Sequence, residues 1–184
     1  MSNLKSRLTR FIGDYGMKEQ KGAFAFFMTN IVALITGYNH QKYWQRRAYL
    51  LDPTKRNYIW KLYCFMYIKR VDAKHLSSFG TSFNTGSSWN TPPNLPHGLN
   101  GIIVGHDAIC GSNITMFQRV TISQKGCVIG DNVILGANCI ILPGVHIGNN
   151  AKVGANCVVV EDVPDGATVV MQKPRIIIKN GNDI

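Results

Sequence analysis

Apolar residues recur every six positions through the second half of the chain. One column advances in steps of six, shifts by one extra residue within Ser123–Gly126 and then resumes: Val104, Cys110, Met116, Ile122, Ile129, Leu135, Ile141, Ile147, Val153 and Val159. A second apolar column lies two positions earlier, from Ile102 to Cys157. Two apolar residues separated by one outward residue are typical of a short strand. The pattern therefore predicts one short strand in every six residues, with a bulged corner at the interruption.

Small and polar residues mark the corners between these predicted strands. Asn, Gly or Asp stands at positions 132, 138, 144, 150, 156 and 162, and these residue types tolerate the left-handed backbone conformation of a tight corner. Three such units close a triangular coil, and successive coils stack as parallel sheets. We therefore predict a mainly β protein whose residues 102–184 form a left-handed parallel β-helix of hexapeptide repeats.

The first part of the chain has helical patterning. Residues 1–75 predict a basic, aromatic-rich helical region. Asp52–Pro53 is typical of a helix start, and the helix that follows is expected to place four residues along one side: Ile59, Leu62, Phe65 and Met66. Residues 76–101 are rich in Ser, Thr, Asn, Gly and Pro, which favours an irregular loop or first coil. We expect the helices to cap this coil and the segment RIIIK (175–179) to close the other end.

Residues 22–38, GAFAFFMTNIVALITGY, form the longest apolar run. A membrane-spanning helix needs about 20 apolar residues, so this shorter run favours a buried or partner-facing helix. An interfacial membrane helix is the alternative, because basic residues flank the run: Lys18, Lys21, Lys42, Arg46 and Arg47.

The excess of positive charge is confined to the predicted helical region. The formal net charge is +10, and residues 1–75 carry 14 basic and 4 acidic residues, whereas the remainder carries 6 of each. The basic residues are scattered among aromatic ones without a zinc-finger or RNP-type motif, which argues against nucleic acid as a partner and favours an acidic glycan or an anionic membrane surface. The five cysteines and the lack of a secretory signal predict a reduced, cytoplasmic protein without a disulfide framework.

Three segments of the chain resemble hexapeptide-repeat acyltransferases: NGIIVGHDAICGSNITMFQRVTI, CVIGDNVILGANCIILPGVHIGNNAKVGANCVVVEDVP and VVMQKPRII. The resemblance is to the serine acetyltransferase-like group, and the stretches YIKRVDA and TPPNLPHGLNGIIV look most like its bacterial capsule and exopolysaccharide O-acetyltransferases. It implies a homotrimer with active sites between subunits, and acetyl-CoA as co-substrate without a metal. The implied reaction is O-acetylation of a sugar hydroxyl of a surface polysaccharide or its precursor.

The resemblance also implies catalytic and cofactor residues. His97, in HGLNGIIV, matches the general base of the family, and Asp72, in KRVDAKH, is the best candidate for a carboxylate that orients it. A hydroxyl that attacks a thioester must lose its proton, and histidine titrates near neutral pH. Three residues match positions that bind coenzyme A along the coils or at its phosphates: Ala137, Ala155 and Arg175. Lys173 is a further candidate for the phosphates beside Arg175. For Asp72, a simple ion pair with Lys69 or Arg70 is the structural alternative.

Three residues near His97 in the sequence or in the repeat are candidate acceptor ligands. Trp89 is suited to stacking on a sugar face, Asn84 to hydrogen bonding with hydroxyls, and Gln118 lies one coil after His97. Loop packing and turn formation are the alternative roles for Asn84 and Trp89.

Hexapeptide repeats also occur with other functions. Serine acetyltransferases usually carry a second histidine where this chain has SQKGCVIG, which counts against L-serine, although serine or a free sugar stays the alternative acceptor. Carbonic anhydrases of the same repeat need three histidines around zinc, and His40, His75, His97, His106 and His146 do not show that spacing. A non-catalytic β-helix scaffold is the third possibility.

Overall fold

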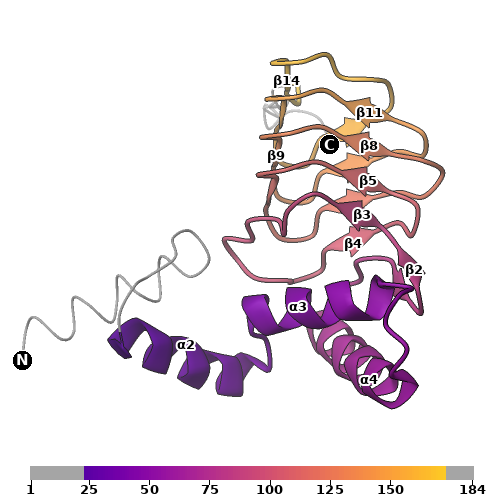
Figure 1. Ribbon diagram of the computed structural model, residues 1–184. Helices are drawn as coiled ribbons and strands as arrows, with labels where there is room; N and C mark the ends of the chain where they lie inside the picture. The colour runs from indigo at the N-terminus through magenta and orange to yellow at the C-terminus, as the bar shows by residue number, and fades with distance from the viewer. Residues whose placement is uncertain (1–22, 173–184) are drawn as a thin grey trace, which may run out of the picture.

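The computed structural model describes the backbone of residues 23–172 and the side chains of residues 30–172. Figure 1 shows a stack of coils with helices lying across one end. The first 22 residues of the predicted helical region and the predicted closing segment RIIIK lie outside the described residues. In the described part, no helix has the length and apolar character needed to cross a bilayer.

Three helices precede the coils: α2 (Ala23–Thr36), α3 (His40–Leu51) and α4 (Tyr58–His75). Asn39 caps α3 by accepting a hydrogen bond from the amide of Lys42, and Asn57 caps α4 in the same way through Trp60. The predicted helix start at Asp52–Pro53 is wrong, because Asp52 instead ends α3. Both Asp52 and Asn57 can cap a helix, and the asparagine is the one placed before the first helical turn.

The faces of α4 also differ from the prediction. Cys64, Ile68 and Val71 are buried on its inner side, whereas Ile59, Leu62 and Met66 are exposed. Apolar residues therefore occur on both sides of this helix, and spacing alone does not identify which side packs against the rest of the molecule.

Twelve short strands form the three faces of the solenoid, each face a four-stranded parallel sheet: β3 (Ser88–Trp89), β4 (Ile103–Val104), β5 (Ile109–Cys110), β6 (Thr115–Met116), β7 (Thr121–Ile122), β8 (Val128–Ile129), β9 (Ile134–Leu135), β10 (Ile140–Ile141), β11 (His146–Ile147), β12 (Lys152–Val153), β13 (Val158–Val159) and β14 (Thr168–Val169). The sheet orders are β4-β7-β10-β13, β3-β5-β8-β11 and β6-β9-β12-β14. Neighbouring strands are three apart in the chain, as the predicted triangular coil requires, except for β3–β5 and β12–β14, where an isolated bridge (Asn94 with Thr115, Val163 with Ile147) takes the place of the intervening strand. The fold class is confirmed, and the coils begin at β3, within the segment predicted as a loop or first coil.

The two apolar columns fill the interior of the solenoid. Residues from Ile102 to Val159 in these columns are almost completely buried, and the four cysteines among them are unpaired thiols. They behave as small apolar residues in a narrow core.

The corners adopt the left-handed conformation that the sequence predicts. Asn132, Asn138, Asn150 and Asn156 have φ between 57° and 60°, and Gly144 has φ 80°. Asparagine side chains also join successive coils, for example through the hydrogen bond from Asn132 Nδ2 to Asn150 Oδ1 at 3.2 Å. Asp162 departs from this rule, because its carboxylate accepts the amide of His146 at 2.8 Å instead.

The extra residue within Ser123–Gly126 forms the expected bulged corner. Lys125 and Gly126 both have positive φ, and their amides donate to one carboxylate oxygen of Asp107 at 2.8 and 3.0 Å. The bulge is thus held by the coil before it.

An aromatic cluster and a buried arginine join the helices to the first coil. Trp44 of α3 packs edge-on against Phe79 and Trp89, with ring centroids 5.3 and 5.5 Å apart. The buried guanidinium of Arg47 donates to the carbonyl oxygens of Phe79 and Ser87 at 3.0 and 2.7 Å. The hairpin of β1 (Thr81–Ser82) and β2 (Thr85–Gly86) packs against α3. The helical region therefore covers the end of the solenoid.

Candidate active site

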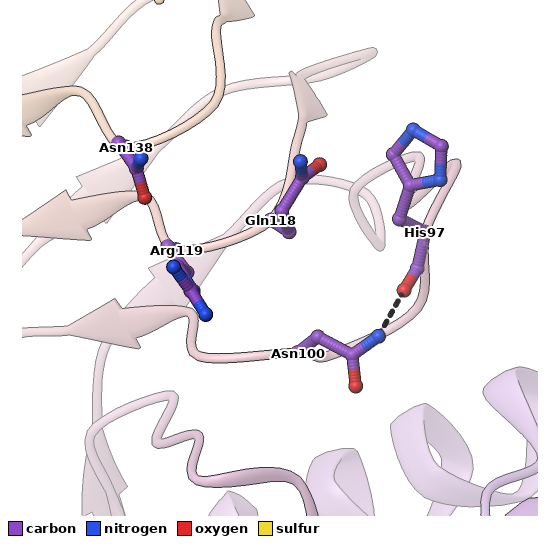
Figure 2. Close-up of a pocket in the computed structure, with 5 residues that line it drawn as sticks. All are labelled: His97, Asn100, Gln118, Arg119 and Asn138. Atoms are coloured by element: carbon purple, nitrogen blue, oxygen red, sulfur yellow. Dashed lines mark hydrogen bonds between the residues drawn. The ribbon is translucent and has the colours of Figure 1, made fainter. Parts of the chain in front are cut away.

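A pocket of about 600 Å³ opens at one corner of the solenoid, beside the helical end (Figure 2). Five residues line it: His97, Asn100, Gln118, Arg119 and Asn138. They come from three successive coils, because the amide of Arg119 donates to Asn100 O at 2.9 Å and that of Asn138 to Gln118 O at 3.1 Å. The volume is typical of a site for a small organic ligand.

His97 stands in the turn that precedes β4. Its carbonyl oxygen accepts a hydrogen bond from Asn100 Nδ2 at 2.9 Å, and its ring lies beside Phe117 with centroids 5.7 Å apart. The side chain is exposed, and neither ring nitrogen bonds to a described residue. Its backbone is therefore held while its imidazole stays free to accept a proton from a ligand.

Arg119 brings a positive charge to the same pocket. Its φ is 59°, as in the asparagine corners, and its stem lies against Gly101, where a Cβ would come within 2.9 Å of Arg119 Cγ. The guanidinium has no ion pair or hydrogen bond with the described residues, and no carboxylate lines the pocket. This pocket is suited to a ligand that carries a negative group.

Gln118 adds an unused acceptor. Its Oε1 is buried without a hydrogen-bond partner among the described residues. Buried polar atoms normally have a partner, so a ligand hydroxyl or ammonium group would satisfy this oxygen. The structure thus brings together His97 and Gln118, as the repeat register predicts.

Asp72 does not reach this pocket within one chain. It is buried in α4, where its Oδ1 accepts a hydrogen bond from the Tyr43 hydroxyl at 2.7 Å and its Oδ2 has no partner in the described part. Burial raises the pKa of Asp72 to about 6, although the Tyr43 hydrogen bond and nearby cations oppose this. The alternative of a simple ion pair is not found either, because its contact is a hydroxyl. A role in orienting His97 stays a prediction.

Asn84 and Trp89 have packing roles rather than positions in the pocket. Asn84 Oδ1 accepts a hydrogen bond from the buried ammonium of Lys61, at the turn of the β1–β2 hairpin. Trp89 is half-buried beside Trp44 and Phe79 and donates from Nε1 to Ser87 Oγ at 2.8 Å. The structure does not bring either residue to His97, because both are used to join the helices to the first coil.

Two of the predicted coenzyme residues stack beside the pocket. Ala137 precedes Asn138. Its carbonyl oxygen accepts a hydrogen bond from the amide of Asn156 at 2.8 Å, which places the neighbouring Ala155 one coil above Ala137. Ala155 is exposed and Ala137 is half-buried. Lys173 and Arg175 lie outside the described residues.

Three pocket residues escaped the sequence analysis: Asn100, Arg119 and Asn138. Asn138 is a corner residue and Asn100 a turn residue, so their types have structural explanations. For Arg119 a signal exists, because an arginine there replaces the asparagine or glycine that later corners carry. Among the described residues, no group of three His, Cys, Asp or Glu side chains is placed to hold a metal ion.

Comparison with known proteins identifies the repeat. Residues 126–160 match the family model described as bacterial transferase hexapeptide (six repeats). This solenoid is therefore a hexapeptide-repeat fold. The hexapeptide chain is also 32% identical over 161 residues to the serine acetyltransferase of a Synechocystis species, across 72% of this chain and 64% of the relative.

Solved structures share the hexapeptide fold. Serine acetyltransferase isoform 3 from Entamoeba histolytica, in complex with cysteine, has a TM-score of 0.60 at 20% identity, covering 94% of this chain and 59% of that one. A serine acetyltransferase in complex with CoA has a TM-score of 0.51 at 23% identity, covering 61% and 47%. At this identity the likeness concerns the fold.

The hexapeptide chain spans about half the length of the curated relatives that it matches, since several of them are covered over 44% of their length. These relatives bear the names of serine acetyltransferases. The expected closeness to polysaccharide O-acetyltransferases is not supported by them, whereas the resemblance to the serine acetyltransferase-like group is.

Proposed function

We propose that this chain is an acyltransferase that moves the acetyl group of acetyl-CoA to a hydroxyl group, with His97 as the general base. The observation that carries this proposal is the free, exposed imidazole of His97 in a pocket at a corner of a hexapeptide solenoid. The names of the relatives support acetyl transfer.

The proposed reaction is a direct transfer. The acceptor hydroxyl gives its proton to a ring nitrogen of His97 while its oxygen forms a bond to the thioester carbon. The carbon–sulfur bond then breaks, and the CoA thiolate takes the proton from the imidazolium. No covalent enzyme intermediate is needed, and the released thiol balances the ester formed.

The positive charge of Arg119 favours an acceptor molecule that carries a carboxylate. Its guanidinium is unpaired among the described residues and lines the same pocket as His97, and guanidinium groups bind carboxylates through two parallel hydrogen bonds. Gln118 Oε1 would accept from an ammonium or hydroxyl group. L-Serine has all three groups, so the relatives' names and the pocket support the same first acceptor.

An acidic sugar of a surface glycan is the second candidate acceptor. The observation in its favour is that His97, Asn100, Arg119 and Asn138 are all exposed, so the pocket is open enough for an acceptor larger than an amino acid. The absence of a histidine within SQKGCVIG also favours this candidate. A sugar carboxylate would take the place of the serine carboxylate at Arg119.

For the donor, we propose that the pantetheine arm lies along Ala137 and Ala155, with Lys173 and Arg175 near the phosphates. The chain is further proposed to act as a homotrimer whose sites lie between subunits, in the cytoplasm. These proposals rest on the resemblance of the repeats.

The first experiment follows loss of the thioester of acetyl-CoA by absorbance rather than with a thiol reagent, because the protein carries five thiols of its own. Wild type, His97→Ala and the control His146→Ala are compared with L-serine, neutral sugars and an acidic glycan as acceptors. We expect His97→Ala to lower kcat by 10²-fold or more and the exposed His146 of β11 to be dispensable. Equal turnover in wild type and His97→Ala would overturn the role of His97.

A further inference from the structure

The outward side of α4 carries a continuous apolar stripe. Ile59, Leu62, Tyr63 and Met66 are 85%, 53%, 47% and 61% exposed. Their spacing of three and four residues places them along one side of the helix. Single exposed apolar residues are ordinary, whereas a contiguous patch of this kind usually marks an interaction surface.

Aromatic and basic side chains border this stripe. Trp60 stacks on Tyr63 with ring centroids 4.9 Å apart, and the Arg46 guanidinium lies 3.9 Å from the ring centroid of Tyr67. Four further exposed basic residues lie at the two ends of the stripe: Lys55, Arg56, Arg70 and Lys74. Exposed Trp and Tyr beside Lys and Arg are the composition found at a bilayer interface.

Residues 30–76 carry nine basic side chains against two acidic ones, Asp52 and Asp72. Asp72 is buried, and Asp52 accepts hydrogen bonds from the amide and hydroxyl of Thr54 at 2.8 and 2.6 Å. The surface is therefore complementary to a partner that is both acidic and apolar beneath its charged layer. An anionic lipid bilayer has this arrangement.

We propose that the outward face of α4 binds the surface of an anionic membrane, with Ile59, Leu62, Tyr63 and Met66 inserted at the interface. This site differs from the apolar run 22–38 that the sequence suggested. The same helix reaches the candidate active site at its other end, because His75 contacts Asn100 of the pocket, with 3.3 Å between His75 Nδ1 and Asn100 Oδ1. Binding through α4 would hold the pocket near acceptors at the membrane.

The test is co-sedimentation of the full chain with vesicles of phosphatidylcholine alone or with about 30% phosphatidylserine, without acetyl-CoA or acceptor. Ile59→Ser/Met66→Ser is the test variant. Val170→Ser/Met171→Ser is its control, since these residues are similarly exposed, at 73% and 58%, and lie at the opposite end of the solenoid. Arg56→Gln/Arg70→Gln tests the charge.

We expect binding to the anionic vesicles that falls about tenfold or more in Ile59→Ser/Met66→Ser and about fivefold for each basic residue removed. The control should bind like wild type, and about 0.5 M salt should weaken binding. Equal binding to neutral vesicles, or binding unchanged in Ile59→Ser/Met66→Ser, would overturn the proposal. So would a fall in oligomer size in that variant without vesicle binding, because a second copy would then cover α4. Since no substrate is present, failure of the proposed enzymatic function would leave this result unaffected.

Discussion

At the residue scale, Arg119 combines an unfavourable backbone conformation with a free charge. Its φ of 59° matches that of Asn138 and Asn156 at the same corner of later coils. A side chain other than Gly, Asn or Asp in this conformation costs about 1 kcal/mol, and strained residues of this kind are often found at functional sites. The strain therefore supports a ligand-binding role for Arg119.

Replacing Arg119 with asparagine separates stability from binding. We expect Arg119→Asn to keep or raise the melting temperature, because asparagine suits the corner, and to raise the KM for a carboxylate acceptor tenfold or more. The KM for acetyl-CoA should change little. Steady-state kinetics with each substrate varied, alongside thermal unfolding, gives both results. A variant that loses stability but keeps its acceptor KM would contradict the assignment.

Asp72 makes the stability of the protein depend on pH. Burial raises its pKa from 3.8 to about 6, so the folded state binds the proton more tightly and the free energy of unfolding falls as pH rises from about 4 to 6. His40 has the opposite effect, because burial lowers its pKa from 6.5 to about 4 and unfolding then becomes harder as pH rises through the same range.

Replacing the Asp72 carboxylate should remove its part of the pH dependence of stability and leave the part that His40 contributes. We expect Asp72→Asn to be about 2 kcal/mol more stable than wild type at pH 7.5 and nearly equal to it at pH 4, since two pKa units correspond to about 3 kcal/mol at most. Urea unfolding at several pH values measures this. A constant difference between the two proteins would contradict it. If Asp72 does orient His97, kcat of the same variant falls as well.

At the element scale, the corners hold successive coils together. Asn132 has a left-handed backbone, receives a hydrogen bond from Asn113 Nδ2 at 3.2 Å and donates to Asn150 Oδ1 at 3.2 Å. Each corner thus combines a conformational requirement with a ladder of side-chain hydrogen bonds.

Two substitutions at Asn132 separate these contributions. We expect Asn132→Ala to lower the free energy of unfolding by about 2 kcal/mol, because it loses both the favoured conformation and the hydrogen bonds. Asn132→Gly keeps the conformation and should lose about half as much. Lys152→Ala, at an exposed strand position, is the control and should stay within about 0.5 kcal/mol of wild type. Circular dichroism during urea unfolding measures these free energies. Equal losses of stability in Asn132→Ala and Asn132→Gly would show that the left-handed backbone conformation makes no contribution.

At the scale of the whole molecule, one face of the solenoid is the best candidate for contact between subunits. The outward residues of the sheet β4-β7-β10-β13 include Ile103, Ile140 and Val158, which are 41%, 36% and 53% exposed. The corresponding positions of β12 and β14 carry Lys152 and Thr168. The more apolar face therefore fits the proposed trimer interface.

Light scattering tests this assembly. Three chains of 20.4 kDa should give a species of about 61 kDa. Ile140→Lys/Val158→Lys should yield monomers and lose activity, since the sites are proposed to lie between subunits, whereas Lys152→Glu on another face should stay trimeric. A wild-type monomer, or a double variant of unchanged mass, would show that this face does not hold the subunits together.

Local patterns of the chain determine the solenoid because each unit repeats the same short-range requirements. Two inward apolar residues define each strand, and a small polar residue defines each corner. The position of a residue in the six-residue repeat therefore predicts the coil register, the bulge near Lys125 and the stacking of Ala137 under Ala155. The same register predicts that Gln118 lies near His97, because residues one coil apart share a corner.

Long-range packing determines features of the structure that the six-residue repeat does not encode. Apolar residues lie on both sides of α4, so only the docking of α3 determines that Cys64 and Ile68 face inward while Ile59 and Met66 face outward. Likewise, Asn84 and Trp89 carry groups suited to sugar binding, yet the contacts between the helices and the first coil take up their hydrogen bonds and surfaces. Asp72 is buried between α3 and α4, where Tyr43 bonds to one of its two oxygens. Arg119 enters the pocket only because the fold stacks its corner between those of Asn100 and Asn138. The repeat thus determined the solenoid by itself, whereas the tertiary structure decided which polar groups remain free for a ligand.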